Sequence, residues 1–138
     1  VNSESLVKGH LQELKLALEA ERRGIKVISI GMKFSDGVKK ADTDLDLLLL
    51  YKGKVFAIES KAYSNAVPGD MVRGDGVSLL KFCEQIRNSG DEVTAIPVFI
   101  FTKAPSKQIL QWLEDNGIKT IVGESDEAMA QLDILARL

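Results

Sequence analysis

The sequence contains very little cysteine and histidine. Cys83 and His10 are the single residues of their types among 138. One cysteine excludes an intrachain disulfide and suits a reducing compartment, so we expect a cytoplasmic protein. A zinc site of the usual kind needs several Cys and His ligands, which this chain does not have. No Ser-His or Cys-His arrangement for covalent catalysis is evident either.

Long apolar runs and an excess of charge of one sign are also missing. No run reaches the roughly 18 apolar residues of a transmembrane helix, and the first residues do not resemble a signal peptide, so we expect no membrane partner. Lys and Arg total 18 against 20 Asp and Glu, which gives a net charge of -2. This balance excludes a broadly basic nucleic-acid coat but leaves room for a local basic patch. The commonest nucleotide-binding enzymes are excluded because there is no P-loop and no GxGxxG motif.

Hydrophobic periodicity predicts one domain over residues 1–138, with elements in the order αβββαβαβα. A three-strand meander followed by strand-helix alternation predicts a mixed sheet flanked by helices, in the α/β or α+β class. Residues 62–76 contain three glycines and a proline and are expected to form a long loop. The predicted elements are helix 4–23, strands 25–32, 44–51 and 54–60, helix 77–89, strand 93–102, helix 105–116, strand 118–123 and a helix capped by Ser125 that runs to about Arg137.

The first predicted helix carries an isolated carboxylate near its apolar face. Val7, Leu11, Leu14 and Leu18 recur at helical spacing and predict the buried side of this helix. Glu13 falls on the flank of that side, among small and apolar neighbours, where a carboxylate needs a partner. The alternative is a residue at the rim that reaches water.

A predicted hairpin places acidic residues opposite one another. If Lys52 and Gly53 are its two turn residues, counting back puts Asp46 opposite Glu59 and, two positions further, Asp44 opposite Lys61, all on one face. Carboxylates about 5 Å apart repel unless a cation lies between them, and Mg²⁺ with its preference for oxygen ligands fits that place. The alternative is a polar strand start beside a solvated pair at the sheet edge.

Together these residues resemble a known family. Gly9-x-x-x-Glu13 on a first helix, then Asp46, then Glu59-x-Lys61, is similar to the pattern of the PD-(D/E)xK nuclease superfamily. The strand around Glu59 resembles those of archaeal Holliday-junction resolvases and nuclease-related domains. The resemblance implies a restriction-endonuclease-like three-layer fold. It also implies a metal-dependent deoxyribonuclease, an endonuclease with structure-specific cleavage among its expected activities, using Mg²⁺ or Mn²⁺ to hydrolyse phosphodiester bonds.

The resemblance also implies a role for each matching residue. Asp46 and Glu59 would bind the metal, with help from the Ser60 backbone carbonyl. Lys61 would orient or activate the attacking water, and Glu13 would hold a metal-bound water or a second ion. This agrees with the chemistry, because the ion lowers the pKa of water and a lysine adds positive charge where negative charge develops.

Three points stay open at this stage. Asp44 replaces Asp46 as the metal ligand if the register slips by two. The apolar residues of the last helix, Met129, Leu132, Leu135 and Leu138, belong either to the core or to an interface, and the low positive charge favours a homodimer or a partner DNA-binding subunit. The alternatives to a deoxyribonuclease are a non-catalytic nucleic-acid-binding or assembly module and a nuclease acting on RNA.

Contacts with DNA require cations around the site. The candidates are Lys39 and Lys40 in the first loop, Tyr63 and Arg73 in the long loop, and Lys81 and Gln85 on the helix that follows.

Overall fold

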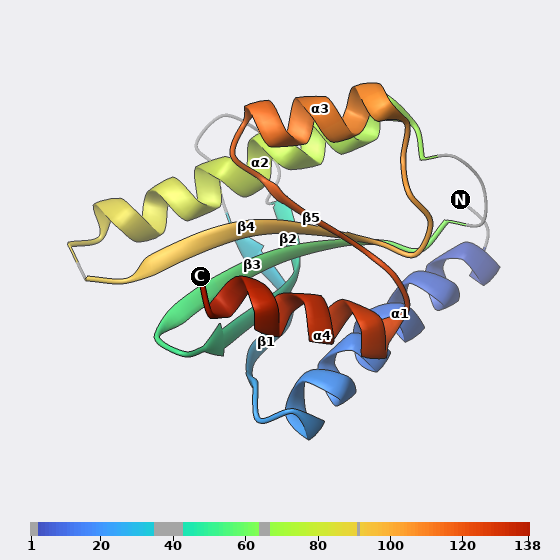
Figure 1. The fold of residues 1–138 in the computed structure, drawn as a ribbon. Coiled ribbons are helices and arrows are strands. Elements are labelled where there is room, and N and C mark those ends of the chain that lie inside the picture. Colours follow the sequence, from blue (N-terminus) through green and yellow to red (C-terminus); the bar gives the residue numbers. More distant parts are fainter. Residues whose placement is uncertain (1–2, 35–42, 64–66, 91) are drawn as a thin grey trace.

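A computed structural model describes residues 3–34, 43–63, 67–90 and 92–138 (Figure 1). The predicted order of elements is confirmed. None of the described helices is long and apolar enough to cross a lipid bilayer. The elements are α1 (Ser3–Arg22), β1 (Lys26–Phe34), β2 (Thr43–Tyr51), β3 (Lys54–Lys61), α2 (Gly69–Asn88), β4 (Thr94–Phe101), α3 (Lys107–Asp115), β5 (Lys119–Val122) and α4 (Ser125–Ala136).

The five strands form one mixed sheet in the order β1-β2-β3-β4-β5. The first three strands are antiparallel, and β3, β4 and β5 are parallel. Helices α1 and α4 cover one face of the sheet, and α2 and α3 cover the other (Figure 1). The fold is therefore the predicted mixed α/β sheet flanked by helices, in three layers.

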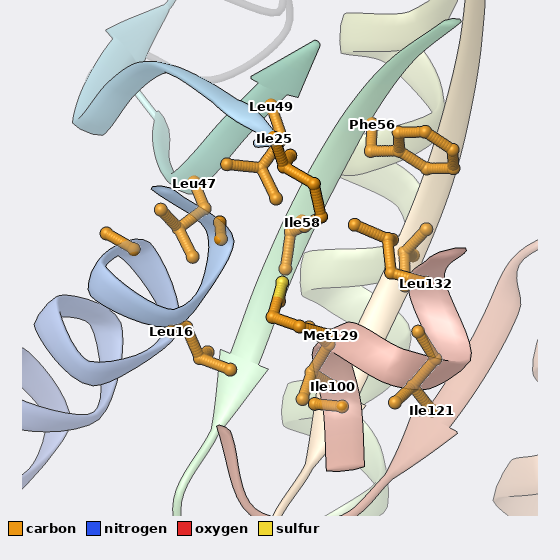
Figure 2. Packing of buried hydrophobic residues seen from close by; sticks show 14 of the residues in the cluster. Leu16, Ile25, Leu47, Leu49, Phe56, Ile58, Ile100, Ile121, Met129 and Leu132 are labelled. Atoms are coloured by element: carbon orange, nitrogen blue, oxygen red, sulfur yellow. The ribbon is translucent and has the colours of Figure 1, made fainter. Parts of the chain in front are cut away.

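Each face of the sheet has its own apolar core. Figure 2 shows the core beneath α1 and α4, where Met129 of α4 lies beside Ile58 of β3, and Leu47 of β2 lies toward Ile25. Met129 and Leu132 are fully buried, so they belong to the core rather than to an interface. The second core, beneath α2 and α3, includes Leu48, Ala57, Leu79, Phe99, Phe101 and Leu113.

The β2–β3 hairpin has the predicted two-residue turn. Lys52 and Gly53 both have positive φ, 52° and 76°, as a tight turn matched to the strand twist requires. The predicted register is confirmed from Tyr51↔Lys54 to Leu47↔Ile58.

Beyond that last pair the regular alternation of β2 breaks. Leu47 packs in the core beneath α1, whereas Leu45 packs in the core beneath α2. A regular strand places residues two apart on the same face, so the chain changes face across Asp46. The ladder between β2 and β3 ends at this point, and the two strands separate there.

Helix α1 is turned by about half a revolution from the predicted orientation. Leu11, Leu14 and Leu18 are about half exposed, at 49, 48 and 59%, and the side chain of Val7 lies outside the described part. The buried face instead carries Glu13, Leu16, Ala17 and Ala20, which also follow helical spacing. Because alanines allow closer approach than leucines, α1 lies against the sheet with Glu13 facing inward.

Helix α2 begins at Gly69, so the prediction of a loop over residues 62–76 is wrong for its second half. Buried Val72, Gly76, Leu79 and Cys83 follow helical spacing from the first turns onward. The glycines suggested a loop, but Gly76 is a packing residue. A Cβ atom there would lie 2.7 Å from Cζ3 of Trp112 on α3.

The predicted cap of the last helix is wrong. The N-cap of α4 is Glu124 without a side-chain cap, and Ser125 is the first helical residue instead of the cap. Pro97 in β4 pairs with Ala57 of β3, while pairing with β5 begins only at Val98. At Pro97 the strand is therefore a local edge, which is where a strand tolerates proline.

Gly74 and Gly76 in the first half of α2 provide a matched pair for testing this packing. At Gly74 an added Cβ meets no atom within 4 Å, so Gly74→Ala should raise the free energy of unfolding by about 0.5–1 kcal/mol through helix propensity. Gly76→Ala should lower it by about 1–3 kcal/mol because Trp112 must move. Urea unfolding followed by circular dichroism measures both, and equal stabilisation of the two variants would contradict the packing.

Candidate metal centre

The site lies where β2 and β3 separate. With no ladder partner opposite it, the Asp46 carboxylate turns to β3, and its Oδ2 atom accepts a hydrogen bond of 2.8 Å from the Ser60 N–H. Glu59 is buried, 7% exposed, and its carboxyl adjoins that of Asp46. The two carboxyls that the hairpin register predicted to be neighbours are therefore in contact. Asp46 and Glu59 adjoin where the ladder between β2 and β3 is broken, and not as a further regular pair of that ladder.

The two acids titrate far from their usual range. Burial, followed by the charges of Asp46 and Asp75, raises the pKa of Glu59 well above its usual value. Burial also raises the pKa of Asp46, although the hydrogen bonds from Ser60 and Glu59 act in the opposite direction.

Helix α1 adds a third carboxyl to this group. Glu13 is 9% exposed and adjoins Asp46, and its Oε2 atom lies 3.5 Å from Nδ1 of His10. Burial, with the charge of Asp46 second, raises the pKa of Glu13 to about 7. At Gly9, the other residue of the helix motif, an added Cβ would meet no described atom within 4 Å, so the packing of the described residues does not require glycine there.

Asp44 does not occupy its predicted place. It is exposed, and Lys61, its predicted partner, forms an ion pair with Asp75 of α2. The ladder ends before it reaches these residues, so the register that paired them no longer applies. The charge of Asp44 acts on Glu13 instead. Of the two alternatives, Asp46 is the carboxylate in contact with Glu59.

Lys61 is the cation of this site, and it is nearly buried, with 11% of its side chain exposed. Burial acts to lower the pKa of Lys61. The hydrogen bond to Asp75 and the charges of Asp75, Glu59 and Asp46 outweigh burial, so that the pKa is raised. Lys61 is therefore an ammonium ion at neutral pH.

The chemistry of these donors fits a hard divalent cation. Glu13, Asp46 and Glu59 offer oxygen ligands alone, and the positive charge of Lys61 is already balanced by Asp75. Within the described residues, no group of three or more His, Cys, Asp or Glu side chains is already arranged around a metal position. Two carboxylates with a backbone carbonyl, water and substrate are sufficient for Mg²⁺, which usually keeps several water ligands.

The predicted substrate contacts are only partly near this site. Lys39 and Lys40 lie outside the described residues. Tyr63 packs against the core beneath α2, and its hydroxyl donates to Sδ of Met71 at 2.9 Å. Arg73 lies on α2 instead of in a loop, and its guanidinium is 3.4 Å from Asp70.

Lys81 and Gln85 are both on α2, but further along it. Residue 75 of this helix contacts Lys61, at the end of β3. At 1.5 Å per residue, Lys81 is about 9 Å and Gln85 about 15 Å further along the helix axis. The structure therefore does not bring Gln85 to the carboxyls. Lys81 lies on the helix between Asp75 and Gln85.

Sequence reasoning missed two polar residues. Asp75 was assigned to a loop, although its position three residues after Val72 and four before Leu79 places it on the inward side of α2. Gln12, 6% exposed, has a buried Nε2 atom with no hydrogen-bond partner in the described part of the chain. A buried donor of this kind normally binds water or a ligand.

The raised pKa of Glu13 predicts how stability depends on pH. A carboxyl whose pKa rises from 4.5 to about 7 on folding stabilises the fold below pH 4.5, and this stabilisation is lost as the pH rises through about 7. In EDTA, the free energy of unfolding should fall between pH 5 and 7, with a contribution from Glu13 of up to about 1 kcal/mol per pH unit.

Urea unfolding of the wild type, Glu13→Gln and Glu21→Gln at several pH values tests this. Glu21 is an exposed carboxylate on the same helix and serves as the control. Glu13→Gln should flatten the slope, and Glu21→Gln should leave it unchanged. An unaltered slope in Glu13→Gln would show that Glu13 does not titrate in this range.

Comparison with known proteins adds evidence on the fold. No family model and no curated protein matches the sequence. Three solved structures are similar at low sequence identity. An XisH family protein from Nostoc punctiforme PCC 73102 has a TM-score of 0.59 and 11% identity, over 86% of this chain and 94% of that one. Protein AF1548 has a TM-score of 0.60 and 14% identity, over 82% of this chain and 57% of that one.

The third similar structure is Can2 from Sulfobacillus thermosulfidooxidans, in complex with cyclic tetra-adenylate. Its TM-score is 0.52 at 15% identity, over 94% of this chain and 34% of Can2. The chain thus spans about half of AF1548 and a third of Can2. At these identities the similarity concerns the fold alone. The mixed sheet with its flanking helices is a restriction-endonuclease-like fold.

Proposed function

We propose that this protein is a metal-dependent nuclease that cleaves DNA phosphodiester bonds internally. The observation that carries this proposal is the contact between Asp46 and Glu59 where β2 and β3 separate, with Lys61 beside them. Two adjoining carboxyls and a neighbouring ammonium group are what a site needs to hold a divalent ion next to a phosphate. Mg²⁺ is the proposed ion, with Mn²⁺ as a substitute.

Each residue has a defined part in this proposal. Asp46 and Glu59 would bind the ion, with the Ser60 carbonyl as a further ligand. A bound ion would supply a water of lowered pKa and neutralise phosphate charge. Lys61 remains an ammonium ion, so it stabilises the negative charge that develops on the phosphate instead of acting as a base. Glu13 orients water beside Asp46.

The acidity of the site limits how it can hold DNA. Glu13, Asp46, Glu59 and Asp75 face the single ammonium group of Lys61. Even with a divalent ion bound, these groups do not attract a polyanion strongly. We therefore propose that further phosphate contacts come from cations such as Lys39, Lys40 and Arg73, and from a second subunit or a DNA-binding partner.

Cleavage of supercoiled circular DNA tests the activity, because a circle has no ends for an exonuclease. With Mg²⁺ or Mn²⁺ the wild type should convert it to open-circular or linear forms. Glu59→Gln and Lys61→Ala should each reduce the rate at least about 100-fold, since each removes a charge acting in the transition state. Glu114→Gln, an exposed carboxylate on α3, is the control.

Parallel assays with branched DNA and RNA separate the alternatives, and circular dichroism confirms that each variant folds. Cleavage that persists in EDTA or in Glu59→Gln would contradict the mechanism. Binding of DNA without any cleavage would favour a non-catalytic module, and cleavage of RNA alone would change the substrate class.

A further inference from the structure

Lys61 is near two groups of carboxylates. Asp75 of α2 forms an ion pair with the Lys61 ammonium group. The charges of Glu59 and Asp46 act on the same ammonium group. A lysine side chain has a flexible four-carbon stem, so either group is within the reach of one residue. The partner that Lys61 selects decides which carboxylates remain available to other cations.

Asp75 is held firmly enough to determine that choice. Val72 and Leu79, on the same side of α2, are both buried in the core beneath the helix. Gly76, the next residue, brings α2 against Trp112, where any side chain larger than hydrogen would clash. The Asp75 side chain remains 34% exposed, so it tolerates its charge better than the buried Glu59 does.

We propose that Asp75 is a positioning residue that holds the Lys61 ammonium group away from the Asp46–Glu59 pair and so keeps that pair available to a divalent ion. The proposal rests on the proposed function and extends it to a residue outside the strand motif. Without Asp75, the nearest carboxylates to Lys61 are Glu59 and Asp46. The ammonium group would then pair with them and compete with the metal from within the same molecule.

The size of this competition follows from a two-state equilibrium. If Lys61 occupies the carboxylate pair in nine of ten molecules of an Asp75→Asn variant, the apparent dissociation constant for the metal rises about tenfold. In the wild type Lys61 is held by Asp75, so removing its amine changes the metal affinity little. The effect of Lys61 on metal binding should therefore depend on whether Asp75 is present.

Isothermal titration with Mn²⁺ in the absence of DNA measures this dependence in four proteins. These are the wild type, Asp75→Asn, Lys61→Ala and the double variant. We expect Asp75→Asn to bind Mn²⁺ about tenfold more weakly, and the double variant to return to within about twofold of Lys61→Ala. Asp70→Asn removes an equal charge from the same helix without touching Lys61 and should have little effect.

Simple loss of negative charge gives a different result. In that case Asp75→Asn weakens binding by the same factor whether or not Lys61 is present, and the additive result would overturn the proposal. Asp75→Glu, which restores the carboxylate, should bind Mn²⁺ more tightly than Asp75→Asn. If Asp75→Asn does not fold, Asp75→Ser takes its place in the same cycle.

The experiment also separates this inference from the proposed function. If the wild type does not bind Mn²⁺, or Glu59→Gln binds it equally well, the metal site itself is wrong. If the wild type binds and Glu59→Gln does not, but the cycle is additive, the metal site stands and the role of Asp75 is wrong.

Discussion

The structure is organised around negative charge that is buried where β2 and β3 separate. Asp46, Glu59 and Glu13 come from two strands and a helix, and burial raises the pKa of each. Burying carboxyls in this way costs folding free energy unless protons, donors or cations compensate them. Ser60 supplies a backbone donor, Lys61 supplies a charge, and a bound divalent ion would supply the rest.

The elements around this site are arranged in ways that apolar burial alone would not favour. Helix α1 turns Glu13 inward and leaves Leu11, Leu14 and Leu18 about half exposed. Helix α2 extends through two glycines so that Asp75 reaches Lys61. In both helices the charged contact at the end of the sheet coincides with a departure from the simplest hydrophobic pattern. Such departures are expected at functional sites.

The sequence was sufficient to predict the parts that depend on local rules. The turn at Lys52 and Gly53 set the hairpin register, which extends to Leu47 and Ile58, the neighbours of Asp46 and Glu59. It was not sufficient where tertiary packing decided between two local solutions. Gly76 suggested a loop because the residue that requires a glycine there, Trp112, is distant in the sequence. Asp44 does not lie opposite Lys61 because the alternation of β2 breaks at Asp46. A prediction that assumes a regular register cannot include such a break.

The most direct test of the account is a crystal structure of the protein grown with Mn²⁺, with anomalous diffraction used to locate the ion. We predict one anomalous peak in contact with the carboxylates of both Asp46 and Glu59, and the Lys61 ammonium group still paired with Asp75. An ammonium group between Asp46 and Glu59, with no anomalous peak there, would contradict the account.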